Sequence, residues 1–366
     1  MRNLRWFSLL AFVVTACSQT PSPPRPPCST DAELGSRCGF ENPEDLTYAP
    51  GYGILIASNL HLNGRGGFLS ALPLAGGAPT RLWPPSDPES GGSGFARMSS
   101  AGEPGCGAPD ADLFAPHGIY LDLRDPVAPL LYVVNHGGRE SIEIFSFGRR
   151  ENETLLFWTA CIELPEGTSG NDVAVAADGE VIVGNYMPPT RKWWSNLKTV
   201  LGLSTGDVLV WNLDKRWRHL PGTRASAPNG VEISADDKWI YYSSTGSGTV
   251  TRVARDGSQA RQADIGGKPD NLTWSSAGTL FVASHESGLE FMKCLRQQPC
   301  RSPWFIAEVE PESLQFKTVL RHDGDVVGAV ASALEVKGSL YLSAVFDDRI
   351  GVWRRPIKPE ATSAPR

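Results

Sequence analysis

The stretch NDVAVAADGEVIVGNY at residues 171–186 combines two runs of alternating apolar residues with a tight turn at 177–179. An alternation with period two is typical of β-strands, and Ala-Asp-Gly is a turn sequence, so the stretch predicts an antiparallel hairpin. It begins with Asn171 and Asp172, whose side chains carry oxygen atoms.

The same pattern occurs six times along the chain. The copies are EDLTYAPGYGILIASN (44–59), HGIYLDLRDPVAPLLYVVNH (117–136), NDVAVAADGEVIVGNY (171–186), NGVEISADDKWIYYSST (229–245), DNLTWSSAGTLFVASH (270–285) and ASALEVKGSLYLSAVF (331–346). Further strands are expected at 141–147, 206–212, 248–255 and 349–354. Six units of about four strands predict an all-β fold, a six-bladed β-propeller. Most connections lack the 3.6-residue apolar pattern that the helices of an α/β barrel require.

One connection does carry a helical pattern. In RKWWSNLKTVLGL, residues 191–203, the apolar side chains fall on one helical face: Trp193, Trp194, Leu197, Val200 and Leu201. Two interpretations remain open from the sequence. The helix is either a lid over the end of the molecule where the copies begin, or a helix that caps a blade or touches a membrane.

The N-terminus has the pattern of a bacterial lipoprotein signal. Arg2 and Arg5 precede an apolar run at 6–16, and Val-Thr-Ala-Cys follows at 14–17. The run is far shorter than the roughly 20 residues of a membrane-spanning helix. We expect Cys17 to be lipidated after cleavage; the alternative is an ordinary residue in the cleavage region. Ser18, where retained lipoproteins often have Asp, favours the outer membrane over the inner one.

The domain organisation follows from these segments. We expect a signal peptide at 1–16, a lipidated cysteine and Pro-rich tether at 17–40, the propeller at 41–356 and a disordered tail at 357–366. A protein of this kind is exported and attached to a membrane through its N-terminus, on the periplasmic side or at the cell surface.

The charge balance excludes one class of partner. The net charge is −6, and it becomes −8 when residues 1–16, with two arginines and no acid, are removed. No basic stripe remains to neutralise phosphates, so nucleic acid is not an expected partner. A closed ring of blades leaves no long strand edge exposed, which favours a monomer.

Six cysteines remain after the signal, and an even number in an exported chain favours disulfides. They are Cys28, Cys38, Cys106, Cys161, Cys294 and Cys300. Pairing of 28 with 38 and of 294 with 300 would close short loops and leave 106 with 161, but sequence alone does not fix the connectivity. The spacings do not match a zinc site.

The residues that begin the copies point to a metal site. If the blades are related by rotation, these side chains converge on the axis, and they offer carboxylate and amide oxygens: Glu44, Asn171, Asn229, Asp270 and Asn271. Oxygen ligands without a Cys or His cage favour Ca²⁺ over Zn²⁺. A single such residue is more often part of a turn, but five copies in register are harder to explain that way.

Histidine and serine residues indicate the type of chemistry. His117 takes the ring position that acids and amides hold elsewhere, and imidazole is the usual general base near neutral pH. His136 is either a hydrogen-bonded structural histidine or a partner behind His117. No Gly-x-Ser-x-Gly motif is present, so an activated water is a better nucleophile candidate than serine.

At this point the chain resembles the paraoxonase family of arylesterases and lactonases. The motifs that carry the resemblance run from Pro43 to Trp353: PEDL (43–46), FAPHGI (114–119), YVVNH (132–136), NDVAV (171–175), APNGVEIS (227–234), PDNL (269–272) and SAVFDDRI (343–350). The resemblance implies a propeller with two calcium ions, one catalytic and one structural.

Residue by residue, the resemblance assigns roles to this chain. The catalytic calcium would be held by Glu44, Asn171, Asn229, Asp270 and Asn271. Asp45, Asp172 and the main-chain carbonyl of Ile119 match the ligands of the structural calcium. His117 and His136 match the family's histidine dyad, and the helix at Trp193 matches an active-site helix that touches membrane or lipid.

The chain also departs from the family. An aromatic residue of the pocket wall is Ala227 here, and a tyrosine after the first hairpin is Leu62. The family's disulfide between the two ends of the propeller is missing, because Cys300 is the last cysteine. We therefore expect strand pairing to close the ring and an altered pocket to change substrate preference.

The sequence thus predicts a calcium-dependent hydrolase of small ester or lactone substrates. One rival is a sugar-lactone hydrolase of the gluconolactonase or senescence-marker type, but the pair His117 and His136 and the apolar Phe346 argue against it. The other rival is a non-enzymatic, membrane-tethered binding scaffold. A scaffold would need only Asp45 and Asp172 for a structural ion, so the further ligands favour an enzyme.

Overall fold

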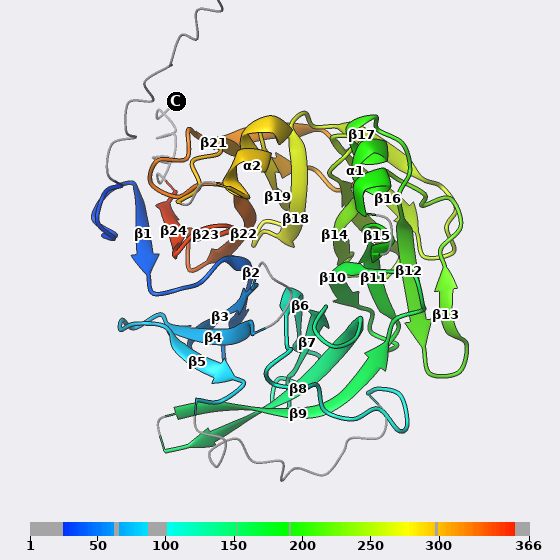
Figure 1. Ribbon diagram of the computed structural model, residues 1–366, viewed down its shortest axis with the longest axis horizontal. Helices are drawn as coiled ribbons and strands as arrows, with labels where there is room; N and C mark the ends of the chain where they lie inside the picture. Colours follow the sequence, from blue (N-terminus) through cyan, green and yellow to red (C-terminus); the bar gives the residue numbers. More distant parts are fainter. Residues whose placement is uncertain are drawn as a thin grey trace, which may run out of the picture.

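Six four-stranded antiparallel sheets surround a common axis in the computed structural model (Figure 1). It describes residues 25–61, 66–86, 101–151, 153–189, 192–296 and 299–355. The prediction of a six-bladed β-propeller is confirmed. The expected signal peptide, the lipidation site Cys17, the pocket residue Leu62 and the tail at 357–366 lie outside the described residues.

The first three blades follow one another along the chain. Blade 1 comprises β2 (Pro43–Ala49), β3 (Ile54–Asn59), β4 (Phe68–Pro73) and β5 (Thr80–Trp83). Blade 2 comprises β6 (Pro116–Asp122), β7 (Leu130–Asn135), β8 (Ser141–Arg150) and β9 (Glu153–Glu163). Blade 3 comprises β10 (Gly170–Val175), β11 (Val181–Asn185), β12 (Asp207–Asn212) and β13 (Arg216–His219).

The remaining blades complete the ring. Blade 4 comprises β14 (Pro228–Ile233), β15 (Trp239–Ser244), β16 (Thr249–Ala254) and β17 (Arg261–Asp264). Blade 5 comprises β18 (Lys268–Trp274), β19 (Leu280–His285), β20 (Trp304–Val309) and β21 (Phe316–His322). Blade 6 comprises β22 (Val330–Val336), β23 (Ser339–Ala344), β24 (Arg349–Arg354) and β1 (Leu34–Cys38). The helices α1 (Lys192–Val200) and α2 (Gly288–Cys294) interrupt blades 3 and 5, and neither is long and apolar enough to cross a membrane.

Strand pairing between the two ends of the chain closes the ring. β1 runs antiparallel to β24, from Leu34 opposite Trp353 to Cys38 opposite Arg349. This is the closure expected in the absence of a terminal disulfide. The propeller therefore begins at Leu34, inside the segment 17–40 that we expected to be a tether, and not at residue 41.

The last part of the expected tether is also fixed. The guanidinium of Arg25 pairs with the buried carboxylate of Asp347 and donates to the carbonyl oxygen of Cys300. Arg349 donates to the carbonyl oxygen of Pro26 at 3.0 Å. A buried carboxylate needs a cationic partner, and the N-terminal segment supplies it.

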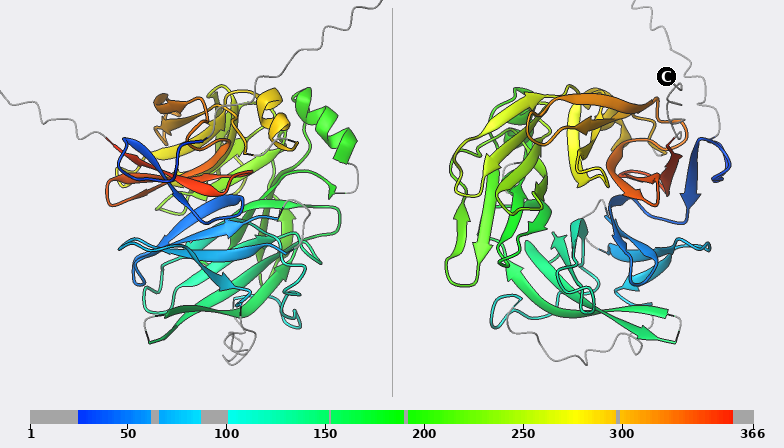
Figure 2. Two further views of the ribbon diagram at one scale, coloured as in Figure 1. Left: turned by 60° about the vertical axis from the view of Figure 1, so that its left-hand side comes forward. Right: turned by 180° about the vertical axis from the view of Figure 1, so that it is seen from behind.

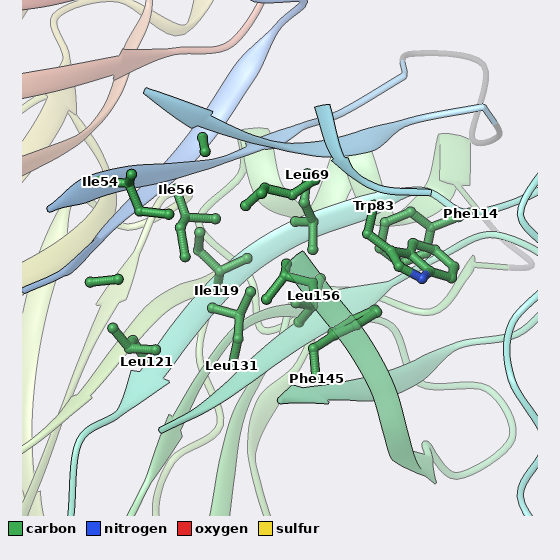
Figure 3. Close-up of a cluster of buried hydrophobic side chains, with 14 residues drawn as sticks. Ile54, Ile56, Leu69, Trp83, Phe114, Ile119, Leu121, Leu131, Phe145 and Leu156 are labelled. Atoms are coloured by element: carbon green, nitrogen blue, oxygen red, sulfur yellow. The ribbon is translucent and has the colours of Figure 1, made fainter. Parts of the chain in front are cut away.

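The hydrophobic core is divided among the interfaces between neighbouring blades. The inner strands β2, β6, β10, β14, β18 and β22 each pack against those of the two adjacent blades. Figure 3 shows the cluster between blades 1 and 2, where Ile56 and Leu69 meet Ile119, Leu131 and Phe145. Similar clusters fill the other five interfaces. The apolar side chains of each blade are thus buried against the neighbouring blades. The residues at the inner ends of the strands are not needed for this core and can carry polar side chains toward the axis.

Three disulfides form between the six cysteines. Cys28 pairs with Cys38, Cys106 with Cys161, and Cys294 with Cys300. The disulfide prediction is confirmed, including the pairing that the short loops favoured.

Candidate active site

Every inner strand is irregular at the residues that begin the six copies. The pairing register shifts between Pro43 and Asp45, Pro116 and Ile119, Gly170 and Val173, Pro228 and Val231, Pro269 and Leu272, and Val330 and Ala333. A β-bulge bends its strand and re-aims side chains, and bulges are common beside active sites. The sequence repeat therefore corresponds to a repeated bulge.

Two glycines allow the inner strands to approach closely at these bulges. A Cβ atom on Gly118 would lie 2.5 Å from both Cα and Oδ1 of Asp172. A Cβ on Gly230 would lie 2.6 Å from Cα of Asn271. Glycine follows His117 and Asn229 because the next blade's main chain occupies that space.

The bulges bring most of the predicted catalytic residues to one cavity of about 760 Å³. Its lining includes Glu44, His117, His136, Asn171, Asn229 and Asp270. Asn271 lies directly behind, where its Nδ2 donates to Glu44 Oε1 at 3.0 Å. Residues from five of the six blades thus converge, as the rotational repeat predicts.

Four oxygen atoms of this group are buried without a hydrogen-bond partner among the described residues. They are Glu44 Oε2, Asn171 Oδ1, Asn229 Oδ1 and Asn271 Oδ1. Unpartnered buried oxygens are costly in a folded protein. Two of the amide nitrogens are engaged, since Asn229 Nδ2 donates to Thr245 Oγ1 and Asn271 Nδ2 donates to Glu44 Oε1, both at 3.0 Å, so the carbonyl oxygens of these amides remain for another ligand. A hard cation such as Ca²⁺ fits this donor set.

The predicted structural ligands line a second cavity, of about 650 Å³. Asp45 accepts from the amide of Ile119 at 2.9 Å, and Asp172 accepts from the amide of Val231 at 2.9 Å. Burial, with the neighbouring charge of Glu44, raises the pKa of Asp45 to about 7. Burial and the charge of Asp45 hold the pKa of Asp172 well above its ordinary value. Carboxyl groups this close and this buried favour a bound cation.

Glu232 is a member of the second cavity that the sequence analysis missed. Burial raises its pKa to about 8, and the charge of Asp45 contributes. The signal was present in APNGVEIS, where a carboxylate stands between the core residues Val231 and Ile233 on an inner strand. Alternation places Glu232 on the side facing the cavity.

The two predicted histidines form a chain with a carboxylate. His117 Nδ1 lies 2.8 Å from His136 Nε2, and His136 Nδ1 lies 2.9 Å from Glu140 Oε2. With both rings neutral, His136 donates to Glu140 and accepts from His117. The free nitrogen of His117 is then Nε2, which lies 3.4 Å from Glu44 Oε1 in the cavity. Glu140 was missed because no repeat or motif singles it out.

Two features of its surroundings shift the pKa of His117 in opposite directions. Burial alone lowers the pKa of this imidazole, but the charge of Glu44 and the hydrogen bond to it, with the charges of Asp270 and Asp45, raise the pKa above its ordinary value. A cation beside Glu44 would counter these charges and favour the neutral base.

A third histidine holds a predicted ligand in place. His285 is fully buried, and its Nε2 lies 3.0 Å from Asp270 Oδ2. Its ring packs on Phe291 of α2 at 4.2 Å between centroids, and Phe291 in turn contacts Phe346. Both phenylalanines line the larger cavity, so the apolar wall expected at Phe346 is present. Ala227, in contrast, is fully buried and is not among the residues lining this cavity.

The helices α1 and α2 stand at the same end of the molecule (Figure 2). Asn196 of α1 and Phe291 of α2 line the larger cavity, so both helices border its rim. The apolar side of α1 faces outward: Trp193 is 73% exposed and Val200 82%, whereas Ser195 is buried. The apolar side of α1 is therefore not the side that faces the propeller. A lid and a membrane contact remain compatible with this arrangement.

A separate surface group could also hold a cation. Ligand atoms of His322, Asp323 and Asp325 lie within 4.8 Å of one another. The two aspartates are exposed, and acidic surface groups are common without an ion. This group lies away from the leading residues of the repeats and plays no part in the candidate site.

The chain is similar in sequence to proteins of a known family. The sequence profile of the arylesterase family matches residues 104–350, about two thirds of the chain. The chain belongs to the arylesterase family. This arylesterase-family protein is 26% identical over 244 residues to serum paraoxonase/lactonase 3 of Homo sapiens, covering 65% of this chain and 68% of that protein. It is 28% identical over 254 residues to serum paraoxonase/arylesterase 2 of Homo sapiens, covering 65% and 69%. The resemblance stated from the motifs is confirmed.

Solved structures share the fold of this family member. A gluconolactonase from Xanthomonas campestris superposes with a TM-score of 0.54 at 16% identity, over 91% of this chain and 95% of that one. The PQQ-bound aldose sugar dehydrogenase of Streptomyces coelicolor gives a TM-score of 0.51 at 12% identity, over 87% and 97%. At these identities the likeness concerns the fold alone.

Proposed function

We propose that this protein is a calcium-dependent hydrolase of lactones and carboxylic esters. The observation that carries the proposal is the set of four unpartnered, buried oxygens in and behind the cavity that also receives Nε2 of His117. Membership of the arylesterase family and similarity to proteins named paraoxonase/lactonase and paraoxonase/arylesterase support the ester and lactone class.

The residues of the larger cavity divide into ligands and a base. Glu44, Asn171, Asn229, Asp270 and Asn271 would hold the calcium ion, which when bound supplies a Lewis acid that polarises a substrate carbonyl. His117 takes the proton from the attacking water at Nε2. His136 and Glu140 orient His117 and stabilise its charged form through the hydrogen-bonded chain.

A second ion has a structural role in this proposal. Asp45, Asp172 and the main-chain carbonyl of Ile119 would hold it, and it would offset the repulsion between carboxylates contributed by blades 1 and 3. Such an ion ties the inner strands together at the axis.

We also propose that the protein is an exported, monomeric lipoprotein anchored through Cys17. The signal pattern before Cys17 and the three disulfides support export. Mass spectrometry of the N-terminal peptide from a bacterial host tests the anchor. A diacylglyceryl cysteine at position 17 is expected, and an unmodified N-terminus downstream of it would contradict the anchor.

The function is tested with the soluble form starting at Ser18 and a substrate panel. The panel is phenyl acetate, a δ-lactone, a long-chain acyl lactone and gluconolactone, each with and without EDTA. We expect turnover of the aliphatic lactones that disappears on chelation and returns with Ca²⁺. Turnover of gluconolactone alone would favour the sugar-lactone hydrolase. A folded, calcium-binding protein that turns over none of the four would favour the binding scaffold.

A further inference from the structure

A third cavity, of about 380 Å³, lies outside the candidate active site. It is bordered by the segment after α1, by the connection between β13 and β14, and by one face of blade 4. The two cavities on the axis and an open surface cavity near Arg218 each contain at least three carboxylates. This third cavity contains none, although the chain as a whole carries a net charge of −6.

Hydroxyl groups cover the blade 4 side of the cavity. Tyr242 stands opposite Thr251, and Ser244 stands opposite Thr249, on the paired strands β15 and β16. All four residues are at most 7% exposed and line the cavity. These hydroxyls lie beside the apolar cluster between blades 3 and 4, to which Tyr242 itself belongs, and a buried hydroxyl that lacks a partner in such surroundings favours a polar occupant.

Two of the buried hydroxyls have no partner among the described residues. Ser244 Oγ and Ser226 Oγ are both buried without a hydrogen bond, and both residues line the cavity. Other hydroxyls are already engaged, since Ser247 Oγ lies 3.3 Å from Thr249 Oγ1. The two free hydroxyls can donate to a ligand oxygen.

Two arginines supply positive charge at the rim. Arg224 and Arg261 line the cavity, are exposed, and form no ion pair with any described residue. A guanidinium presents its donors in a planar fork that matches the oxygens of phosphate. Hydroxyl donors on the walls and unpaired guanidinium groups at the rim together match an oxyanion.

We propose that this cavity binds a phosphate group, as part of a small phosphate ester or of a lipid headgroup. Its volume accommodates an ester more readily than single waters. The lipid source is suggested by its position: Gly202 and Ser204 line the cavity, and the neighbouring Leu201 and Leu203 are 62% and 52% exposed. A phosphate held here would leave the attached acyl chains beside the apolar side of α1.

The test compares the calcium-loaded soluble form with the double variant Arg224→Gln, Arg261→Gln and with Arg354→Gln. Arg354 is an exposed arginine on β24, outside the cavity, and serves as the matched control. Isothermal titration with glycerol phosphate measures the soluble ester, and flotation with phosphatidylglycerol and phosphatidylcholine vesicles measures the lipid. Ser244→Ala keeps the charge and removes one free hydroxyl.

We expect the wild type and Arg354→Gln to bind one probe alike, and the double variant to bind it about tenfold or more weakly. Ser244→Ala should weaken the same binding several-fold. Loss confined to glycerol phosphate identifies a soluble ester, and loss confined to vesicles identifies a lipid. Equal binding by the wild type and the double variant, equal loss in Arg354→Gln, or no binding of either probe would overturn the proposal. Catalytic activity is not a readout here, so the result is independent of the proposed hydrolase.

Discussion

Glu44, Asn171, Asn229, Asp270 and Asn271 were identified from their place at the start of a repeated phrase, and the fold gathers them at one cavity. Repetition made these residues visible in the sequence. Glu140 and His285 were not assigned roles, because each acts through a contact that only the folded chain creates. Sequence reasoning finds residues that share a pattern and misses residues that support them from single, unrelated positions.

The histidine chain gives a graded prediction. His117→Gln should lower turnover by roughly 100-fold or more, because it removes the general base, whereas Glu140→Gln should lower it by about tenfold, because it removes only the group that orients His136. Steady-state kinetics on the best lactone measure both effects. His219→Gln is the matched control, since His219 pairs with Asp207 at the surface of blade 3.

The calcium affinity of these variants distinguishes a general base from a metal ligand. Titration calorimetry should show that His117→Gln and Glu140→Gln keep the calcium affinity of the wild type. A large loss of calcium affinity in His117→Gln would mean that this histidine supports the metal site instead of the water. Wild-type turnover in the same variant would remove it from the mechanism.

The hairpins of the six copies were predicted correctly as elements because alternation and turn residues are local signals. The pairing of β1 with β24 joins residues about 300 positions apart, and no local pattern identifies Leu34–Cys38 as a strand of blade 6. The helix α1 was predicted from its periodicity, but the direction of its apolar side was not. An amphipathic pattern states that one side is apolar and not what covers it.

We expect the exposed apolar side of α1 to contribute to binding of lipid vesicles. The double variant Trp193→Ser, Trp194→Ser should bind lipid vesicles roughly tenfold more weakly than the wild type, because these side chains contribute apolar area that water otherwise surrounds. The melting temperature should change little. Vesicle flotation and a thermal melt of the Ser18 form measure the two properties.

The matched control for the helix is Val127→Ser. Val127 is 90% exposed on the turn between β6 and β7, away from α1 and outside the larger cavity. If the α1 variant binds vesicles normally but has a raised KM for long-chain lactones, the helix is a lid and not a membrane contact. A vesicle defect in Val127→Ser would indicate nonspecific adsorption.

The whole molecule is a ring in which two groups of acids meet near the axis, one in each of two cavities. The number of blades followed from counting copies. The division of the acids between two sites was predicted only from the resemblance to the paraoxonase family. No local pattern indicates it, because Glu44 and Asp45, like Asn171 and Asp172, are adjacent in sequence but line different cavities. Alternation along bulged strands produces this division, and the repeated phrase marks where the bulges lie without showing which cavity each side chain faces.

Removal of calcium should destabilise the whole ring. At a calcium concentration of about 100 times Kd, each site contributes about 2.7 kcal/mol of stability, so EDTA should lower the melting temperature by several degrees. Differential scanning calorimetry measures the change. Asp172→Asn should lose much of this response, whereas Asp178→Asn, on the turn of the same hairpin, should retain it. An identical response in both variants would exclude Asp172 as a ligand.

If the protein is anchored through Cys17, as we propose, the ion pair between Arg25 and Asp347 would limit how far the larger cavity could move from the membrane. Asp347 follows Phe346, which lines the larger cavity, so the ion pair holds Arg25 close to that cavity. If Cys17 carries the lipid, only the seven residues 18–24 separate it from Arg25, and the eight steps between the two Cα atoms reach at most roughly 28 Å when fully extended. This short tether would keep the larger cavity close to the bilayer. Amphiphilic molecules diffusing in two dimensions along the lipid would encounter the site far more often than solutes from the bulk.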